Sequence, residues 1–395
     1  MNENKQYNIL LVHNRYQQYG GEDTVVEAEM KLLKDNGHTV NLYTRDNHEI
    51  NGLNNVKLLI DGIWSRKTIS DFKKIFLKDR PDIIHVHNTF PLISPSIYWA
   101  ASFYNVPIIQ TIHNFRLSCI QAMFLREKKI CEDCLAKSPW RGIARKCYRG
   151  SMLASMSAAA ILQFHRMIGT YEKKVTTYIA LNKFCKNKLV EMGLPEDKIS
   201  IKPNFVTLKN NGSRTKRNGN PLFVGRLSEE KGISTLAQSI KSLPNQIFDI
   251  VGNGPEKHIL ESINNVRMIG SINQDDVYDL MQKAPFLVLP SIWYENMPRT
   301  LVESFGNGTP VIASSLGALT ELVEHGRTGL LFKPGSSDEL TREISWALEN
   351  TKEMDEMGRN ARNVYEVDYT GSANYKILLN IMQKSMDKVQ KISAK

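Results

Sequence analysis

The sequence lacks the features that would place the protein across a membrane or outside the cell. It has no run of about 20 apolar residues, which excludes an ordinary membrane-spanning helix. Its first residues, MNENKQYNILLVHN, lack the charged start, apolar stretch and small-residue cleavage site of a secretory signal. We therefore expect a cytoplasmic protein, in which the five cysteines do not form structural disulfides.

Global disorder is also excluded, because hydrophobic residues make up 42% of the 395 residues, enough for two ordinary cores. The chain does have an excess of positive charge, with a formal net charge of +10. Residues 113–190 hold fifteen Lys and Arg against four Asp and Glu, an excess of eleven. Such a face attracts an anionic partner, such as a lipid surface, nucleic acid or a phosphorylated substrate. A solvated surface would explain the composition equally well.

Short apolar segments bounded by turn residues recur along the chain and predict buried parallel strands. In the first half they cover residues 7–12, 39–43, 82–87, 106–112 and 177–181, and a helix is predicted over 24–36. After a polar stretch at 206–220 they cover 222–224, 247–251, 267–269, 286–289, 311–313 and 330–332. This alternation predicts an α/β protein with two doubly wound parallel sheets, whose ligands bind at the carboxyl ends of strands.

The polar stretch sets the predicted domain boundary. We expect an amino-terminal domain over residues 1–205 and a carboxy-terminal domain over 206–370. The final helical segment, 371–395, belongs to neither alternation and is expected to pack back onto the first domain.

The stretch SIWYENMPRTLVESFG, residues 291–306, places two acids eight residues apart just after a predicted strand. Asn296 suits a helix cap, and Pro298 suits the first helical turn. The unpaired amides of that turn suit a phosphate. Glu295 and Glu303 could then bind hydroxyls on its two sides, a sugar at one end and a ribose at the other. Spacing alone would also allow two surface glutamates.

Two further motifs follow predicted strands of the second domain. In VGRLSEEKG, residues 224–232, Arg226 and Lys231 can both reach a diphosphate, the first as a planar fork and the second as a point charge. In VGNGPE, residues 251–256, Gly252 and Gly254 allow close approach of the backbone.

Taken in this order, these motifs resemble those of the retaining, nucleotide-sugar-dependent glycosyltransferases of family 4, a likeness that covers nearly the whole chain. The resemblance implies the GT-B fold, two Rossmann-like domains facing across a cleft. It implies that Arg226 and Lys231 bind the donor diphosphate, that Glu295 contacts the donor sugar and that Glu303 contacts the ribose. Many members have glycines between the two acids, whereas this chain reads NMPR. The donor loop would then comprise Asn296, Met297, Pro298, Arg299 and Thr300.

The first half also carries motifs that match the family: YGGED, HVHN and TIHN. By resemblance, the loop with Gly20 and Gly21 lies over the donor phosphate and admits the acceptor, although an ordinary strand-to-helix turn would read the same. His113 ends its strand and matches a histidine that touches the donor sugar, which makes it a candidate catalytic residue. His85 and His87 are interpreted as structural polar residues, and Arg116 as an aid to the phosphate or the acceptor.

No D-x-D motif stands at a strand end, since Asp275 and Asp276 open a helix. We therefore expect catalysis without a metal cofactor. Arg226, Lys231 and the helix amides near Thr300 would neutralise the leaving diphosphate instead. The chain offers no good enzymic nucleophile, which favours front-face displacement with retention.

Four of the five cysteines cluster in the sequence, at Cys119, Cys131, Cys134 and Cys147. A C-x-x-C pair flanked by one cysteine on each side can close a structural zinc site of four thiolates. Reduced packing cysteines or a redox pair are the alternatives. A subset of family 4 resembles this cysteine-containing insert, which would shape the acceptor side.

The segment SMLASMSAAAILQF, residues 151–164, is apolar, too short to span a bilayer, and surrounded by basic residues. It predicts either a monotopic helix on an anionic membrane or a buried helix of the first domain. With the family resemblance, it leads us to expect a peripheral enzyme on the inner face of the cell membrane. It would move a sugar from a UDP- or GDP-sugar to a glycan, expected to be lipid-linked, in bacterial capsule, O-antigen or exopolysaccharide synthesis.

Two other functions fit parts of the sequence. A zinc-ribbon protein that binds nucleic acid would use the cysteines and the basic segment, but it would leave the Arg226, Lys231, Glu295 and Glu303 set unused. The basic segment also lacks the interleaved aromatics of a single-strand groove, so nucleic acid is not expected as a partner. A GT-B protein that binds a nucleotide sugar without transferring it is the third reading.

Overall fold

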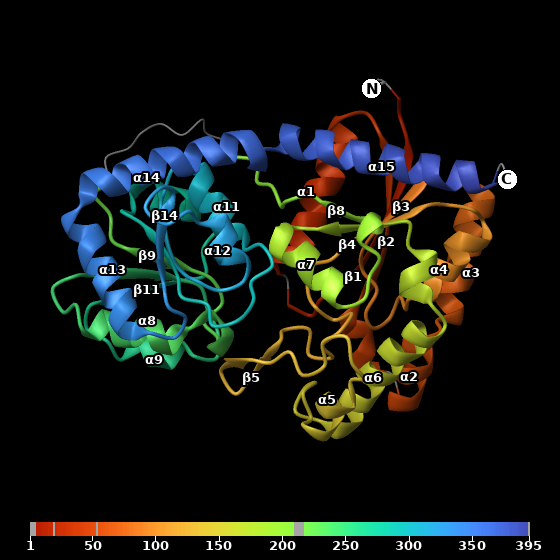
Figure 1. Cartoon of the computed structure of the whole chain (residues 1–395), viewed down its shortest axis with the longest axis horizontal. Coiled ribbons are helices and arrows are strands. Elements are labelled where there is room, and N and C mark those ends of the chain that lie inside the picture. Colours follow the sequence, from red (N-terminus) through yellow and green to blue (C-terminus); the bar gives the residue numbers. More distant parts are fainter. Residues whose placement is uncertain (1–4, 19, 53, 209–216, 394–395) are drawn as a thin grey trace. The chain divides into compact units, whose positions relative to one another are not determined.

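The computed structural model describes residues 5–18, 20–52, 54–208 and 217–393, so most of the expected polar linker lies outside the described residues. The chain divides into two compact units, each built round a six-stranded parallel sheet (Figure 1). The first unit comprises Met1–Met123, Glu132–Lys202 and Asn374–Lys395, and the second comprises Phe124–Cys131 and Pro203–Ala373. The predicted α/β class with two doubly wound sheets is confirmed.

The sheet of the first unit has the strand order β2-β1-β3-β4-β7-β8. The chain winds outward from β1 in one direction and then, from β3, in the other, so the switch point of the topology lies between β1 and β3. Five of the strands follow the predicted segments, and the three-residue β8 had no apolar run long enough to predict it. The bounds are β1 (Asn8–Arg15), β2 (Thr39–Asp46), β3 (Ile83–Asn88), β4 (Ile108–Thr111), β7 (Thr177–Ala180) and β8 (Ile199–Ile201).

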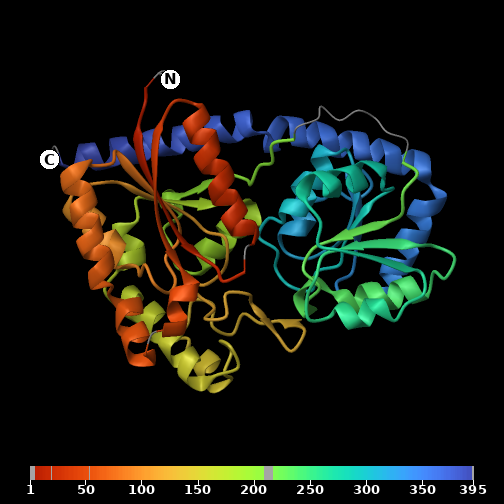
Figure 2. The ribbon, with the colours of Figure 1, turned by 180° about the vertical axis from the view of Figure 1, so that it is seen from behind.

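Helices α1 (Gly21–Asp35) and α15 (Gly371–Ser393) pack on one face of this sheet, as the view from behind in Figure 2 also shows. Leu33 of α1 and Leu378 and Met382 of α15 share a core with Ile9 and Leu11 of β1. The carboxy-terminal helix therefore completes a core that begins some 370 residues earlier in the chain. The remaining helices of the unit are α2 (Asn55–Ile63), α3 (Arg66–Lys78), α4 (Ser96–Phe103), α5 (Trp140–Ala144), α6 (Met152–Met167) and α7 (Lys183–Glu191).

The sheet of the second unit has the order β11-β10-β9-β12-β13-β14, with its switch point between β9 and β12. All six strands follow predicted segments: β9 (Leu222–Val224), β10 (Phe248–Val251), β11 (Val266–Gly270), β12 (Leu287–Leu289), β13 (Val311–Ser314) and β14 (Gly329–Phe332). Its helices are α8 (Ile233–Lys241), α9 (Lys257–Glu261), α10 (Gln274–Lys283), α11 (Arg299–Gly306), α12 (Ala318–Leu322), α13 (Ser337–Glu349) and α14 (Thr351–Val364). The apolar residues of α8 and α13 join those of the strands in one buried core.

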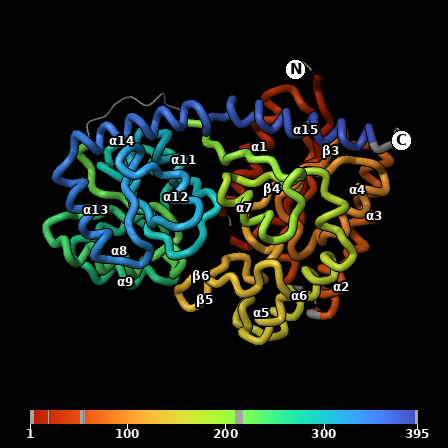
Figure 3. The backbone as a smooth tube through the Cα atoms, in the orientation of Figure 1, coloured from red at the N-terminus to blue at the C-terminus, as the bar shows by residue number. Residues whose placement is uncertain are grey.

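The cysteine-containing insert forms a short antiparallel hairpin of β5 (Leu125–Arg126) and β6 (Lys129–Ile130), labelled in Figure 3. By its contacts this hairpin groups with the second unit, whereas the rest of the insert groups with the first. Among the described helices, none combines the length and the hydropathy that crossing a bilayer requires.

Candidate functional site

In the second unit, three loops at the carboxyl ends of neighbouring strands are joined by backbone hydrogen bonds. The amide of Leu227, after β9, donates to the carbonyl of Asn253, after β10, at 2.9 Å. A Cβ on Gly252 would lie 1.9 Å from the carbonyl oxygen of Gly225, and one on Gly254 would lie 2.2 Å from that of Leu227. Only glycine permits this approach, so the VGNG motif packs the loop against the one that carries Arg226.

The loops after β9 and β12 bring Lys231 and Glu295 together at the switch point. The Lys231 Nζ donates to Glu295 Oε1 at 2.6 Å, and the Ser291 hydroxyl donates to the same oxygen at 2.7 Å. Burial opposes ionisation of Glu295, but the Lys231 ammonium and these hydrogen bonds hold the pKa of its carboxyl below the usual value. An ionised acid therefore stands beside a cation at the place where ligands of such sheets bind.

Helix α11 begins directly after this loop. The cap position is Pro298 rather than the predicted Asn296, and no side chain caps the helix. Pro298 itself has an extended backbone, with φ −66° and ψ 126°, so the helix starts later than an Asn296 cap would require. Its first-turn amides, at Arg299 and Thr300, face outward from the helix end without a side-chain partner from a cap.

Two other predicted residues of this loop have roles within the fold. Met297 is buried, and its sulfur and carbonyl oxygen each accept a hydrogen bond from Asn204 at 3.1 Å. Arg299 donates to Glu303 Oε1 at 2.9 Å, one turn further along α11. Burial raises the pKa of the Glu303 carboxyl, and the Arg299 guanidinium acts in the opposite direction. Arg226 is exposed, and in the described part of the chain it forms no ion pair.

In the first unit, His113 lies just after β4 and contacts His87 at the end of β3. His87 Nδ1 and His113 Nε2 are 2.9 Å apart, and the rings stack with centroids 5.2 Å apart. Burial lowers the pKa of His113 well below its usual value, so the ring is neutral at physiological pH. The two residues are among those that line a cavity of about 60 Å³, with Asn114 and Arg116.

Gly20 and Gly21 stand at the start of α1, where the Gly20 amide donates to Asp23 Oδ2 at 2.9 Å. A Cβ on Gly20 would find its nearest neighbour at 3.8 Å, and one on Gly21 would find none within 4 Å. Neither glycine has a positive φ, so the fold of this unit does not itself require glycine there. Asp23 also bonds to His13 Nε2 at 2.9 Å, and the His13 ring lies 6.5 Å from that of His87.

Glu22, between these glycines and Asp23, is an acid that the sequence analysis did not single out. It accepts a hydrogen bond from the Tyr16 hydroxyl at 2.9 Å. Burial raises the pKa of Glu22 to about 7, against the opposing effects of His13 and Arg116. A carboxyl that titrates near neutrality beside the loop predicted to cover the donor phosphate is a candidate for proton transfer.

Three of the four clustered cysteines belong to one neighbourhood of the first unit. A Cβ on Gly142 would lie 3.8 Å from Cys134 Sγ, and the Gly142 carbonyl accepts from the amide of Cys147 at 2.9 Å. The Ser118 hydroxyl, next to Cys119, donates to the carbonyl of Cys134 at 3.1 Å. None of the five cysteines forms a disulfide.

Comparison with known proteins assigns both units to one enzyme class. Residues 19–210 match the model of Glycosyltransferase Family 4, and residues 209–364 match that of Glycosyl transferases group 1. Among solved structures, a sucrose-phosphate synthase from Thermosynechococcus elongatus superposes with a TM-score of 0.70 over 99% of this chain and 100% of that one, at 18% identity. The chain is a glycosyltransferase of the GT-B fold.

The relatives of this glycosyltransferase include bacterial proteins named for a cps region and for teichuronic acid biosynthesis. An uncharacterised 42.6 kDa protein in the cps region of Klebsiella pneumoniae is 26% identical over 356 residues, 80% of this chain and 87% of that protein. The putative teichuronic acid biosynthesis glycosyltransferase TuaC of Bacillus subtilis is 26% identical over 274 residues, 67% of this chain and 61% of that one. Anabaena HepE, solved with UDP, superposes with a TM-score of 0.66 over 95% of this chain and 100% of that one, at 17% identity.

Ser291 and Glu29 escaped the sequence analysis for different reasons. Ser291 was quoted only as the start of its motif, since a serine before a loop carries no signal of its own. Glu29 did leave a signal, because it shares the buried face of α1 with Val25, Val26 and Leu33. A charged residue within an apolar stripe needs a buried partner, which the sequence could not identify.

Proposed function

We propose that this glycosyltransferase moves a sugar, with retention of configuration and without a metal cofactor, from a UDP- or GDP-sugar to a lipid-linked glycan of a bacterial surface polysaccharide. The arrangement of Lys231 and Glu295 carries the proposal. Two groups assigned to opposite ends of one donor, its diphosphate and its sugar, lie 2.6 Å apart at the switch point of the second sheet. A donor bound to both residues would replace the Lys231–Glu295 contact with its own contacts to each of them.

The positive charges of this region support departure of the diphosphate without a metal ion. Lys231 and Arg226 stand at the end of β9, and the uncapped amides of α11 follow the loop after β12. Preorganised donors of this kind stabilise negative charge that develops in the transition state. The acceptor hydroxyl would attack from the side of the leaving phosphate, which would take its proton, and Glu295 would hold the donor sugar.

The donor is tested first by thermal shift against UDP-, GDP-, ADP- and TDP-sugars, because a ligand that binds only the folded state raises the melting temperature. We expect a shift with one donor, lost in Lys231→Ala and kept in Lys241→Ala, an exposed lysine of α8. No shift with any donor would contradict the proposal.

For the active donor, proton NMR of the product's anomeric centre separates retention from inversion, and chelator treatment tests the independence from metal.

A lipid-linked acceptor is supported by the exposed face of α6. One face of this helix is buried through Ala158, Ile161 and Leu162, as the alternative of a buried helix predicts. The other face exposes large apolar side chains at Met152, Leu153 and Met156, and Trp140 of α5 is 62% exposed. The exposed basic residues nearby in the chain are Arg141, Arg145, Lys146 and Arg149. An apolar face with a basic border is typical of helices that lie on anionic membranes.

Vesicle flotation tests this surface. The protein should float with vesicles of anionic phospholipid and not with neutral ones, and raised salt should weaken the binding. The double variant Met152→Asp/Met156→Asp should lose flotation, whereas Leu77→Asp, an exposed apolar residue of α3, should not. Equal flotation of both variants would place the membrane contact elsewhere.

We also propose a structural zinc ion held by Cys119, Cys131, Cys134 and Cys147. Contacts through Ser118 and Gly142, which join the segments of Cys119, Cys134 and Cys147 within the first unit, support it. Purified protein should contain one equivalent of zinc, which Cys134→Ser lowers and Cys185→Ser, at a buried cysteine of α7, does not. Zinc content that is unchanged in Cys134→Ser would contradict this site.

A further inference from the structure

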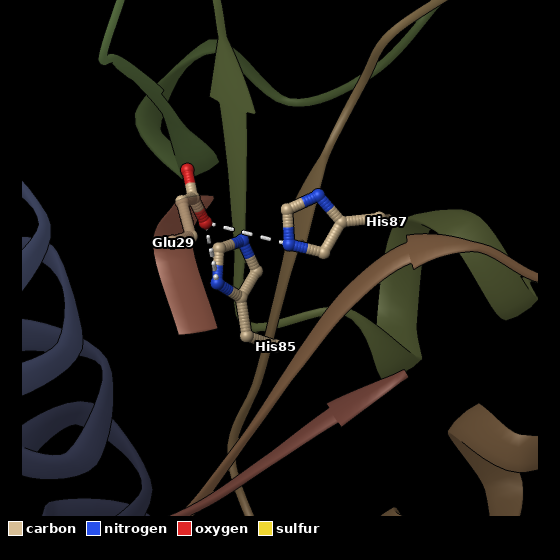
Figure 4. A group of neighbouring side chains, drawn as sticks. All are labelled: Glu29, His85 and His87. Carbon is tan, nitrogen blue, oxygen red and sulfur yellow. Dashed lines mark ion pairs between the residues drawn. The ribbon is translucent and has the colours of Figure 1, made fainter. Parts of the chain in front are cut away.

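A cluster of polar side chains lies fully buried in the first unit, behind His113. Figure 4 shows Glu29 of α1 with His85 and His87 of β3, where both dashed contacts end at the same carboxylate oxygen. His85 Nδ1 and His87 Nε2 each lie 3.4 Å from Glu29 Oε2. None of the three side chains has any exposed surface. Both nitrogens lie within ion-pair distance of the carboxylate oxygen, but these three atoms have no hydrogen-bond partner among the described residues.

Glu29 is held as an anion. The Lys202 ammonium, equally buried, bonds to its other oxygen and donates to Asn374 at 3.2 Å. Burial alone would raise the pKa of this carboxyl, but Lys202 together with His85 and His87 keeps it well below the usual value. An ionised carboxylate only accepts hydrogen bonds, so the nitrogens that face Glu29 Oε2 must carry protons.

The positions of these two protons determine which of the remaining ring nitrogens in the cluster are protonated. Burial keeps His85 and His87 neutral by lowering the pKa of each, so each ring has one proton. With its proton on Nδ1, His85 accepts the Thr111 hydroxyl at Nε2, at 2.8 Å. With its proton on Nε2, His87 has a lone pair on Nδ1, and His113 Nε2, 2.9 Å away, must donate to it.

We propose that Glu29 and His87 are positioning residues, which hold His113 protonated at Nε2 so that its Nδ1 lone pair accepts a hydroxyl of the donor sugar. The inference rests on the proposed function for the identity of that hydroxyl. The tautomer itself does not depend on the proposed function, because it follows from contacts within the first unit. In the described residues, His113 Nδ1 has no protein partner, and the ring lines the cavity beside Asn114 and Arg116.

A divalent metal ion is the other occupant that this geometry suggests, since the three ligand atoms lie within 4.8 Å of one another. The charges already present at this site argue against a metal ion. Lys202 already supplies one positive charge to Glu29 in a site without exposed surface, and a divalent cation would add two more beside it. Every other nitrogen of the two rings also has a hydrogen-bond partner.

The tautomer can be measured without any substrate. Protein labelled with ¹⁵N in its histidine rings gives long-range ¹⁵N–¹H correlations that distinguish protonated from unprotonated ring nitrogens, and His113→Gln identifies the signals of His113. We expect His113 protonated at Nε2. A His113 protonated at Nδ1 would overturn the proposal whether or not the protein transfers sugar.

The variant Glu29→Gln/Lys202→Met removes both buried charges together, so neither is left unpaired. A melting temperature is checked first, and Glu27→Gln on the exposed side of α1 serves as the matched control. We expect the Nε2–H preference of His113 to weaken in the double variant and kcat to fall about 10–100-fold, the usual cost of losing a partner that orients a functional histidine. In the control, both should stay unchanged.

If the folded double variant keeps His113 fully protonated at Nε2, Glu29 does not set the tautomer and the proposal is wrong. If it does not fold, the single variant His87→Phe, which keeps the Lys202–Glu29 pair, answers the same question. A metal ion that is retained when the four clustered cysteines are replaced by serine, and lost in the double variant, would overturn the proposal in favour of a metal site. Failure of sugar transfer with the expected tautomer intact would instead count against the proposed function alone.

Discussion

Each unit holds one lysine–glutamate pair near the switch point of its sheet, and the two pairs differ in burial. Lys202 and Glu29 in the first unit are both 0% exposed, whereas Lys231 and Glu295 in the second are 25% and 8% exposed. The first pair is enclosed by protein groups, with Asn374 bonded to the lysine and with His85 and His87 beside the carboxylate. The second leaves the lysine partly exposed to solvent, where the phosphate of the proposed donor would replace its partner.

This difference separates a pair that maintains the fold from one that can bind a ligand. Two charges without water must stay paired, because either alone would be strongly destabilising. A partly exposed ion pair can exchange one partner at a small cost in free energy, since solvent or an anion compensates the charge that remains. The four predictions that follow test this contrast.

The largest expected effect on stability comes from breaking the enclosed pair. Lys202→Met leaves the Glu29 carboxylate buried without its cation, and the free energy of unfolding should fall by about 3–5 kcal/mol. Lys231→Met should cost clearly less, because Glu295 keeps the Ser291 hydroxyl and the site reaches solvent. Chemical unfolding followed by circular dichroism compares the two variants, and equal losses would remove the distinction between the pairs.

The next effect is on catalysis rather than on stability. Glu295→Gln keeps the size of the side chain but removes the charge beside Lys231, and kcat should fall by about 10²–10³, as for loss of one preorganised contact to the reacting group. Steady-state kinetics with the donor found by thermal shift measures it. The control is Glu261→Gln, in exposed surface on α9 of the same unit. A variant with normal kcat would show that Glu295 has no part in transfer.

A third prediction uses pH. Burial raises the pKa of Glu22 in the folded protein to about 7 from its usual value of 4.5. The protonated acid is therefore favoured by folding, and its contribution is complete below pH 4.5 and lost as the pH rises through 7. Glu22→Gln cannot ionise, so above pH 7 it should be more stable than the wild type by up to about 3 kcal/mol. Unfolding at pH 5 and pH 8 measures this gain.

At pH 5 the gain of Glu22→Gln should nearly disappear. The same substitution at Glu295 should not reproduce the trend, because Lys231 lowers rather than raises the pKa of that carboxyl. A gain of equal size at both pH values would mean that Glu22 is not protonated by burial.

The smallest effect is expected from an exposed pair on α1. Lys31 and Asp35 lie 2.7 Å apart but are 76% and 58% exposed. Lys31→Ala should change the free energy of unfolding by no more than about 0.5 kcal/mol, as is usual for surface pairs one helical turn apart. The same unfolding assay measures it, and a loss comparable with that of Lys202→Met would show that burial does not explain the ranking.

The strands were predictable because their residues are apolar in short runs between turn residues. Eleven of the twelve strands of the two parallel sheets lie within or beside predicted segments, and the twelfth, β8, is only three residues long. The cap of α11 was placed two residues early, at Asn296, since the sequence shows a good capping residue there but not that Pro298 takes the cap position with an extended backbone. Local patterns thus located the elements better than their ends.

The sequence alone determined the class of the fold, the order of the strands along the chain, and the motifs that stand at their carboxyl ends. These features depend on neighbours within a few residues, so apolar periodicity, glycines and proline record them. The tertiary structure alone decided that Lys231 meets Glu295 and that Glu29 meets His85, His87 and Lys202. These partners are 64 and up to 173 residues apart, and only the winding of each sheet brings them together. Their protonation followed from burial, which no local pattern encodes.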